Sequence, residues 1–262
     1  MRAPIAPRRR RSSIAAQALF EWPRRALVTA LVAGTAASCS DLPTELTPGA
    51  RAFEHNLRIG APGWEAGFAN YRPDMGDDME LEAGHEPLPE ALDEDGSMGL
   101  YIAGTNRSDD LFMFWKDRVD GLDPFTPYRV EFEVEFATEA PSGCVGNGGP
   151  PGESVYVKAG ATLVEPEAVV GHEMGDEYYV MNIDKGNQAQ EGADAKILGH
   201  VGNTASECTD WEWELKQLEG HSPIEIETDA EGAAWLIIGT DSGFEGRTRL
   251  YYTWLRVVFE PI

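Results

Sequence analysis

Two tryptophans, Trp211 and Trp213, are separated by one residue and directly follow Asp210. Exposed aromatic faces beside carboxylate and amide groups are chemistry suited to a sugar, whose ring stacks on the indole while its hydroxyls bond to the polar groups. On a strand, residues two apart share a face, so both indoles would lie side by side. The alternative is that these bulky rings belong to the hydrophobic core.

A second candidate ligand surface combines two polar turns that are distant in sequence. One turn contains Asn182, Asp184 and Lys185, and the other joins Asp241 to the aromatic Phe244. Lys185 is notable because basic residues are scarce in this part of the chain. Ordinary structural turns explain both segments equally well.

Carboxylates and amides also cluster where a calcium ion could bind. Hard cations take oxygen ligands, often from alternate positions of a glycine-bearing loop. The clusters are Asp93 with Asp95, then Asn106, Asp109 and Asp110, and also Asp74, Asp77 and Asp78. Structural calcium is therefore the cofactor that the sequence suggests, although a solvated acidic loop explains each cluster as well.

Catalytic motifs are incomplete. His172-Glu173 begins like the zinc motif H-E-x-x-H, but Asp176 stands where the second histidine should be. Glu131, Glu133 and Glu135 share one strand face and could form a glycosidase pair if that face lined a cleft. Alternate glutamates are also what a water-facing sheet displays, and no G-x-S-x-G elbow follows the leader. The sequence thus favours a non-catalytic role.

The first 38 residues have the pattern of an export signal. Arginine runs at 8–11 and 24–25 precede an apolar stretch from Ala26 to Ala37, which is too short to span a bilayer. Ala36-Ala37-Ser38-Cys39 is similar to a bacterial lipobox, so Cys39 is the predicted lipidation site. Residues 39–52 would then be a tether, and 53–262 the folded domain. Cleavage near Ala37 without lipidation is the alternative.

The other two cysteines, Cys144 and Cys208, suggest a disulfide, because an even pair in an exported chain is normally oxidised. Cys144 lies in the glycine-rich segment 143–149, which lacks the Lys-Ser/Thr of a phosphate loop. The segment therefore reads as a tight loop that the disulfide anchors.

Charge excludes one class of partner. Residues 1–38 hold seven arginines and one glutamate, so the rest of the chain has 14 basic and 44 acidic residues, a formal charge of −30. Nucleic acid binding needs clustered Lys and Arg, whereas so acidic a surface repels the phosphates of a nucleic acid. Membrane contact would come from the lipid on Cys39.

Short strands dominate the predicted secondary structure. In 129–136 (RVEFEVEF) apolar and charged residues alternate strictly, the pattern of a half-buried antiparallel strand. Strands are also expected at 154–158, 178–183 and 250–259, and 224–239 reads as a hairpin. The apolar run 111–115 could be a buried strand or a helical turn. The predicted fold is an all-β antiparallel sandwich, of jelly-roll type, after a disordered signal and tether.

Three blocks carry a family resemblance: 99–112, 143–159 and 239–252. They resemble recurrent segments of uncharacterised bacterial secreted proteins and lipoproteins, a resemblance that implies no activity. The last strand, with Trp254, Leu255, Val257 and Phe259, is similar to the closing strand of galactose-binding-like and carbohydrate-binding jelly rolls. This second likeness concerns architecture, which does not by itself determine function.

Three functions are compatible with these features. The leading hypothesis is a non-catalytic envelope lipoprotein that binds carbohydrate or another extracytoplasmic ligand, and exposed aromatics beside polar loops would support it. A structural or protein-interaction lipoprotein comes second, and an apolar patch on an otherwise acidic face would support it. A glycoside hydrolase comes last, and two close carboxylates in a cleft, one with a raised pKa, would support it.

Overall fold

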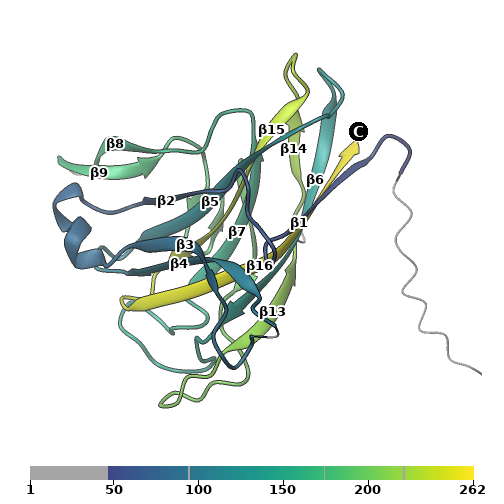
Figure 1. Cartoon of the computed structure of the whole chain (residues 1–262). Helices are drawn as coiled ribbons and strands as arrows, with labels where there is room; N and C mark the ends of the chain where they lie inside the picture. Colours follow the sequence, from purple (N-terminus) through teal and green to yellow (C-terminus); the bar gives the residue numbers. More distant parts are fainter. Residues whose placement is uncertain (1–46, 94, 174, 221) are drawn as a thin grey trace, which may run out of the picture. The chain divides into compact units, whose positions relative to one another are not determined.

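The computed structural model describes residues 47–262 apart from 94, 174 and 221 (Figure 1). The predicted signal peptide and the lipidation site at Cys39 lie outside these residues. The described chain folds into two antiparallel sheets that pack as a sandwich, which confirms the predicted all-β class. No helix among the described residues has the length and apolarity that crossing a membrane would require.

Sheet A contains seven strands. They are β1 (Arg51–Asn56), β3 (Glu82–Pro87), β4 (Met98–Thr105), β6 (Pro127–Thr138), β13 (Glu214–Glu219), β14 (Ile224–Glu227) and β16 (Arg247–Pro261). Their order is β13-β6-β16-β4-β3, with β1 also paired to β16 and β14 to β6. Strand β1 begins two residues inside the segment that we expected to be tether. A short 3-10 helix, η1 (Pro73–Met79), precedes β3.

Sheet B contains five strands. They are β2 (Glu65–Ala69), β5 (Leu111–Asp120), β7 (Val155–Thr162), β12 (Ala195–His200) and β15 (Ala233–Ser242), in the order β12-β7-β15-β5-β2. The remaining strands form two small hairpins, β8 (Ala168–Glu173) with β9 (Asp176–Met181) and β10 (Gly186–Asn187) with β11 (Gln190–Glu191).

The main core lies between the two sheets, and strand β6 shows how the sequence produces it. Val130, Phe132, Val134 and Phe136 point inward and are at most 4% exposed. The charged residues between them face outward, as period-two alternation predicts. Tyr252 and Phe259 of β16 fill the same interior.

A second, smaller core lies on the outer side of sheet B. Residues 163–194, which we call the cover segment, pass over this side and carry both small hairpins. Ile183 of the cover segment packs with Phe112, Phe114 and Ile237 of the sheet. The apolar run 111–115 is therefore a strand, and it is apolar on both faces because both faces are buried.

One predicted element is wrong. Residues 224–239 do not form a hairpin, because β14 pairs with β6 in sheet A whereas β15 pairs with β5 and β7 in sheet B. The turn at Asp229–Gly232 thus carries the chain from one sheet to the other. Gly232 adopts φ +64°, a conformation that glycine takes without steric cost.

Candidate functional site

A row of three aromatic rings crosses the outer face of sheet A. Tyr251 of β16 is directly opposite Tyr101 of β4, with ring centroids 4.9 Å apart. On its other side Tyr251 meets the edge of Trp213, at 5.3 Å. All three rings are partly exposed. Their strand neighbours on the far sides, Gly84 opposite Tyr101 and Ala137 opposite Tyr251, are small residues.

Charged groups border this aromatic row. Arg249 lies 5.5 Å from the Trp213 ring centre and donates two hydrogen bonds, of 2.6 and 2.7 Å, to Glu139. At the other end, Glu82 accepts from Tyr101 Oη at 2.8 Å and from Arg247 at 2.9 Å. Fixed donors and acceptors therefore stand at both ends of the row.

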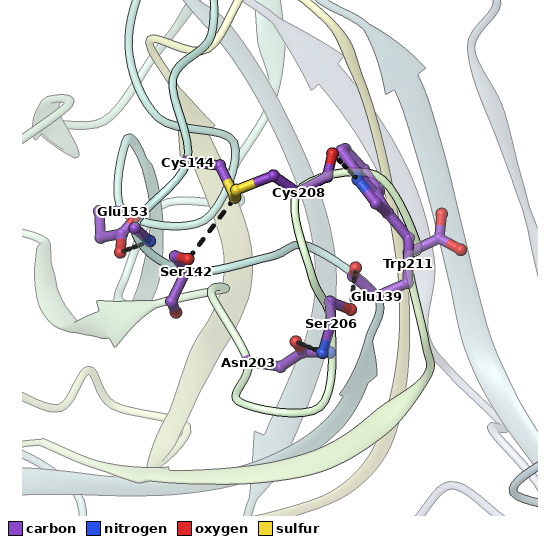
Figure 2. Close-up of a disulfide and its surroundings, with 9 residues drawn as sticks. Glu139, Ser142, Cys144, Glu153, Asn203, Ser206, Cys208 and Trp211 are labelled. Carbon is purple, nitrogen blue, oxygen red and sulfur yellow. Dashed lines mark hydrogen bonds between the residues drawn. A yellow bond between two sulfur atoms is a disulfide. The ribbon is translucent and has the colours of Figure 1, made fainter.

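Trp211 lies in the loop held by the disulfide, as Figure 2 shows, and Asp210 precedes it in the sequence. Cys144 and Cys208 are bonded, with Cα atoms 5.6 Å apart, so the predicted disulfide is confirmed. Trp211 is 38% exposed, and its Nε1 donates to the Cys208 carbonyl at 3.5 Å. Residues 211–213 precede β13 and are not in a strand, so the two indoles do not share a strand face. Only Trp213 joins the aromatic row.

The second predicted ligand surface is mostly internal. Asp241 is fully buried, and its Oδ2 accepts hydrogen bonds of 2.8 Å from Lys158 Nζ, Lys185 Nζ and the Gln188 amide. Lys158 and Lys185 are 1% and 4% exposed. Lys158 also donates to the carbonyls of Lys185 and Gln190. These bonds fasten the cover segment to sheet B.

The other residues of that predicted surface hold turns. Asn182 exchanges hydrogen bonds with the backbone of Glu165 and Glu167, both at 2.8 Å. Asp184 accepts from the amides of Ala193 and Gly186, and these bonds hold its pKa below the usual value. Phe244 packs over the glycine-rich loop, where a Cβ at Gly146 would meet the ring at 2.7 Å. Ligand binding by these residues stays a prediction.

Asp110, predicted as a metal ligand, pairs instead with Asp241. The two side chains are in hydrogen-bonding contact. Burial, followed by the charge of Asp241, raises the pKa of Asp110 to about 7. Burial acts in the same direction on Asp241, but Lys185, the bond from Asp110 and Lys158 outweigh it, and the Asp241 pKa is lowered. Of the two carboxyls, Asp110 is therefore the one that keeps a proton to higher pH.

Asp110 lies at a polar cleft of about 370 Å³. The cleft is formed by loops of sheet B on one side and by the cover segment on the other. Its lining residues are Asn70, Ser108, Asp109, Asp110, Asp176, Tyr178, Val180, Asn187 and Gln188. Asn70, Asp109 and Gln188 all have positive φ angles, so the backbone around the cleft is held in a costly conformation.

The predicted calcium ligands do not assemble into one group. Asp93 Oδ1 accepts from the amides of Gly96 and Ser97 and so closes its own loop, where exposed Asp95 has φ +64°. Buried Asn106 donates to the Ser242 carbonyl at 2.8 Å. Within the described ranges, no three His, Cys, Asp or Glu side chains are arranged to hold a metal. Calcium at Asp109 and Asp110 remains an untested prediction.

The residues that resemble parts of catalytic motifs, His172 and the alternate glutamates of β6, lie on strands. His172 is on β8, opposite Glu177 of β9, so it lies in a hairpin and not on a helix. Glu135 pairs with Arg58 at 2.7 Å, and Glu133 accepts from Gln217, both on the outer face of sheet A. These glutamates belong to a water-facing sheet surface.

No protein-family model matches the chain, and no curated protein matches it. Solved structures with a similar fold include a carbohydrate-binding module, TmCBM27, studied for mannan recognition. It is 12% identical, with a TM-score of 0.35, covering 79% of this chain and 98% of that one. The K3 cleaved adhesin domain of Lys-gingipain from Porphyromonas gingivalis is 10% identical, with a TM-score of 0.33 and coverages of 80% and 99%. TmCBM61, solved with β-1,4-galactotriose, has 11% identity, a TM-score of 0.31 and coverages of 74% and 88%. Function must therefore be inferred from this chain's own residues.

Proposed function

We propose that the protein is a non-catalytic lipoprotein of the bacterial cell envelope that binds a glycan on the outer face of sheet A. The aromatic row of Trp213, Tyr251 and Tyr101 carries this proposal. Partly exposed rings on one sheet face, with Arg249 and Glu82 at the two ends, offer stacking surfaces together with directed hydrogen bonds. Leaving three aromatic rings partly exposed to water forgoes the free energy that their full burial would contribute.

The cleft that Asp110 lines does not have the carboxyl geometry of a glycoside hydrolase. Glycosidases place two carboxyl groups on either side of the scissile bond, about 5 Å or more apart. Asp110 and Asp241 are in direct contact, and Asp241 is fully buried, so a glycosidic bond cannot pass between them. The pair therefore fails the geometric requirement of the hydrolase hypothesis, although the raised pKa of Asp110 meets its electrostatic one.

A glycan array probed with the purified protein tests the binding proposal, in calcium and again in EDTA. Selective binding that Trp213→Ala and Tyr251→Ala each reduce at least about tenfold would support the aromatic row, since burying a large apolar side chain contributes about 1.5–3 kcal/mol. Trp235→Ala is the matched control, because Trp235 is a partly exposed ring of sheet B with Lys116 5.6 Å from its centre. Equal loss in all three variants, or no binding, would favour the hypothesis of a structural or protein-interaction lipoprotein.

Lipid anchoring needs a separate experiment. Expression in a bacterium fed labelled palmitate should label the wild-type protein, whereas Cys39→Ser should remain unlabelled and leave the membrane fraction. Label on the Cys39→Ser protein would contradict the anchor. The disulfide is consistent with an exported protein, because such bonds persist in oxidising compartments.

A further inference from the structure

Lys158 and Asp241 are held in contact on the outer side of sheet B by the pairing of their strands. Strand β7 pairs with β15 so that Lys158 is opposite Gly239, two positions from Asp241. The two side chains therefore meet diagonally, with Lys158 Nζ 2.8 Å from Asp241 Oδ2. Lys158 Nζ also donates to the carbonyls of Lys185 and Gln190, at 2.9 and 3.0 Å. An amine and a carboxyl group fixed in this way reach an effective concentration of about 10⁵ M or more.

The surroundings of this pair favour neutral groups over charged ones. The two side chains are 1% and 0% exposed. Phe112 is directly opposite Asp241 on β5, and Lys185 Nζ lies 4.9 Å from the centre of the Phe112 ring. Keeping an ammonium and a carboxylate in so apolar a place is energetically costly, and a neutral amide avoids that cost. Joining the two groups with loss of water is thus favoured here, whereas at an exposed ion pair both charges stay hydrated.

The two oxygens of Asp241 have different partners. Three donors converge on Oδ2, each at 2.8 Å: Lys158, Lys185 and the Gln188 amide. This leaves Oδ1, which no donor reaches among the residues that the structure describes, for the hydrogen-bonding contact with Asp110. Asn70 Nδ2 holds the other oxygen of Asp110, at 2.6 Å. Asp110 is thereby positioned to pass protons to one Asp241 oxygen while donors hold the second.

The protonation states of the three side chains support the same chemistry. Burial is the main cause that lowers the pKa of Lys158, and the charge of Lys185 adds to it, so the uncharged and nucleophilic amine becomes easier to reach. The pKa of Asp110, raised to about 7, leaves it with a proton to donate.

We propose that the ε-amino group of Lys158 condenses with the carboxyl group of Asp241 after folding, which forms an isopeptide bond between β7 and β15 and releases one water molecule. Lys158 Nζ attacks Cγ of Asp241, so a C–N bond forms and the C–Oδ1 bond breaks. The two protons that the ammonium loses end on Oδ1, with Asp110 donating a proton and recovering one. Oδ2 becomes the amide carbonyl oxygen, and the donors already directed at it stabilise the oxyanion of the intermediate.

Tryptic peptide mapping of the reduced and alkylated wild-type protein tests the bond. Trypsin cleaves after Lys and Arg, and an acylated Lys158 resists it. The expected product is a branched peptide in which residues 130–185 are joined to 217–247, lighter than the sum of the two by one water molecule. Finding only the separate peptides 130–158 and 217–247, or a branch that joins 159–196 to 217–247 through Lys185, would overturn the proposal.

The chain contains an internal control for this map. Lys116 Nζ lies 2.5 Å from Glu165, but that carboxylate is 41% exposed. Trypsin should therefore cleave after Lys116 as usual. The map also gives the fraction of chains that are still ion-paired, so the stability of that form can be measured separately.

Asp110→Asn should lose the branched peptide, because an amide side chain cannot pass the protons. Asp109→Asn is the matched control and should keep it, since Asp109 is exposed and has φ +66°, a conformation that Asn adopts readily. The same branched peptide in Asp110→Asn as in wild type, or its loss in Asp109→Asn, would contradict the role of Asp110. Should Asp110→Asn not fold, the wild-type map decides whether the bond exists.

Discussion

Lys158 Nζ and Asp241 Oδ2 lie 2.8 Å apart in an interior where the two side chains are 1% and 0% exposed. The two residues are on neighbouring strands of sheet B, and Lys185 reaches the same oxygen from the cover segment. The cluster therefore joins the sheet to the segment that covers it, and Asp241 offsets part of the charge of the two lysines where water cannot.

Removing the shared carboxylate should destabilise the protein strongly. Asp241→Asn leaves two buried ammonium groups without a counter-charge, so we expect the free energy of unfolding to fall by about 3–5 kcal/mol. Urea denaturation measures this value. Glu231→Gln is the control, since Glu231 is an exposed partner of Arg118 at 2.6 Å and its loss should cost no more than about 1 kcal/mol. Similar losses in both variants would show that the buried cluster of Lys158, Lys185 and Asp241 does not stabilise the fold more than an exposed ion pair does.

The stability of the protein should fall as pH rises from about 4 to about 7. The pKa of Asp110 is raised to about 7, so in this interval the folded state holds a proton that the unfolded state has lost. Its contribution is largest below the unfolded pKa, decreases by at most about 1.4 kcal/mol per pH unit, and is gone above pH 7. Urea denaturation at pH 5 and pH 8 measures the change.

Asp110→Asn provides the comparison, because Asn cannot titrate. Burial also raises the pKa of Asp117, so the wild-type slope contains more than one group. The difference between wild type and variant isolates Asp110. If the free energy of unfolding falls equally for both proteins between pH 5 and pH 8, the pKa of Asp110 is not raised in the folded state.

Reducing the disulfide should destabilise the domain without unfolding its sheets. Cys144 and Cys208 are separated by 64 positions, and closing a loop of that length stabilises a protein by about 4 kcal/mol on the chain-entropy model. The Cys144→Ser/Cys208→Ser double variant should show this loss in urea while keeping the far-ultraviolet spectrum of a β protein. A loss below about 1 kcal/mol would mean that the loops hold together without the bond.

Tyr252→Phe should be neutral or stabilising. The Tyr252 hydroxyl is fully buried, and burial raises its pKa. It has no hydrogen-bond partner in the part of the chain that the structure describes. Removing an unsatisfied buried hydroxyl relieves a desolvation cost of about 1–3 kcal/mol, although a small cavity offsets part of the gain. A loss above about 1 kcal/mol in thermal or urea unfolding would reveal a bonded hydroxyl.

Several features of the site could be inferred from single residues, and others could not. Trp213 could be selected because two tryptophans that flank one glutamate and follow Asp210 are conspicuous in sequence. Tyr101 and Tyr251 could not, because only the pairing of β4 with β16 brings positions 150 residues apart onto adjacent strands. Asp241 was expected at a surface because it lies in a polar, glycine-bearing segment. The sequence did contain one signal: residues 111–115 are apolar at every position, and a strand of that kind needs a second layer of chain over its outer face.

By itself the sequence determined the class of fold and the disulfide. Strict alternation in β6 can bury one face of a strand only, and Cys144 and Cys208 were the two cysteines left besides the predicted lipidation site, Cys39. The tertiary structure decided which strands pair, and so sent β14 and β15 to different sheets. It also decided that Lys158, Lys185, Asp110 and Asp241 meet. The reason is physical: alternation and turn residues act over a few positions, whereas strand pairing and charge compensation join residues that only the folded chain brings together.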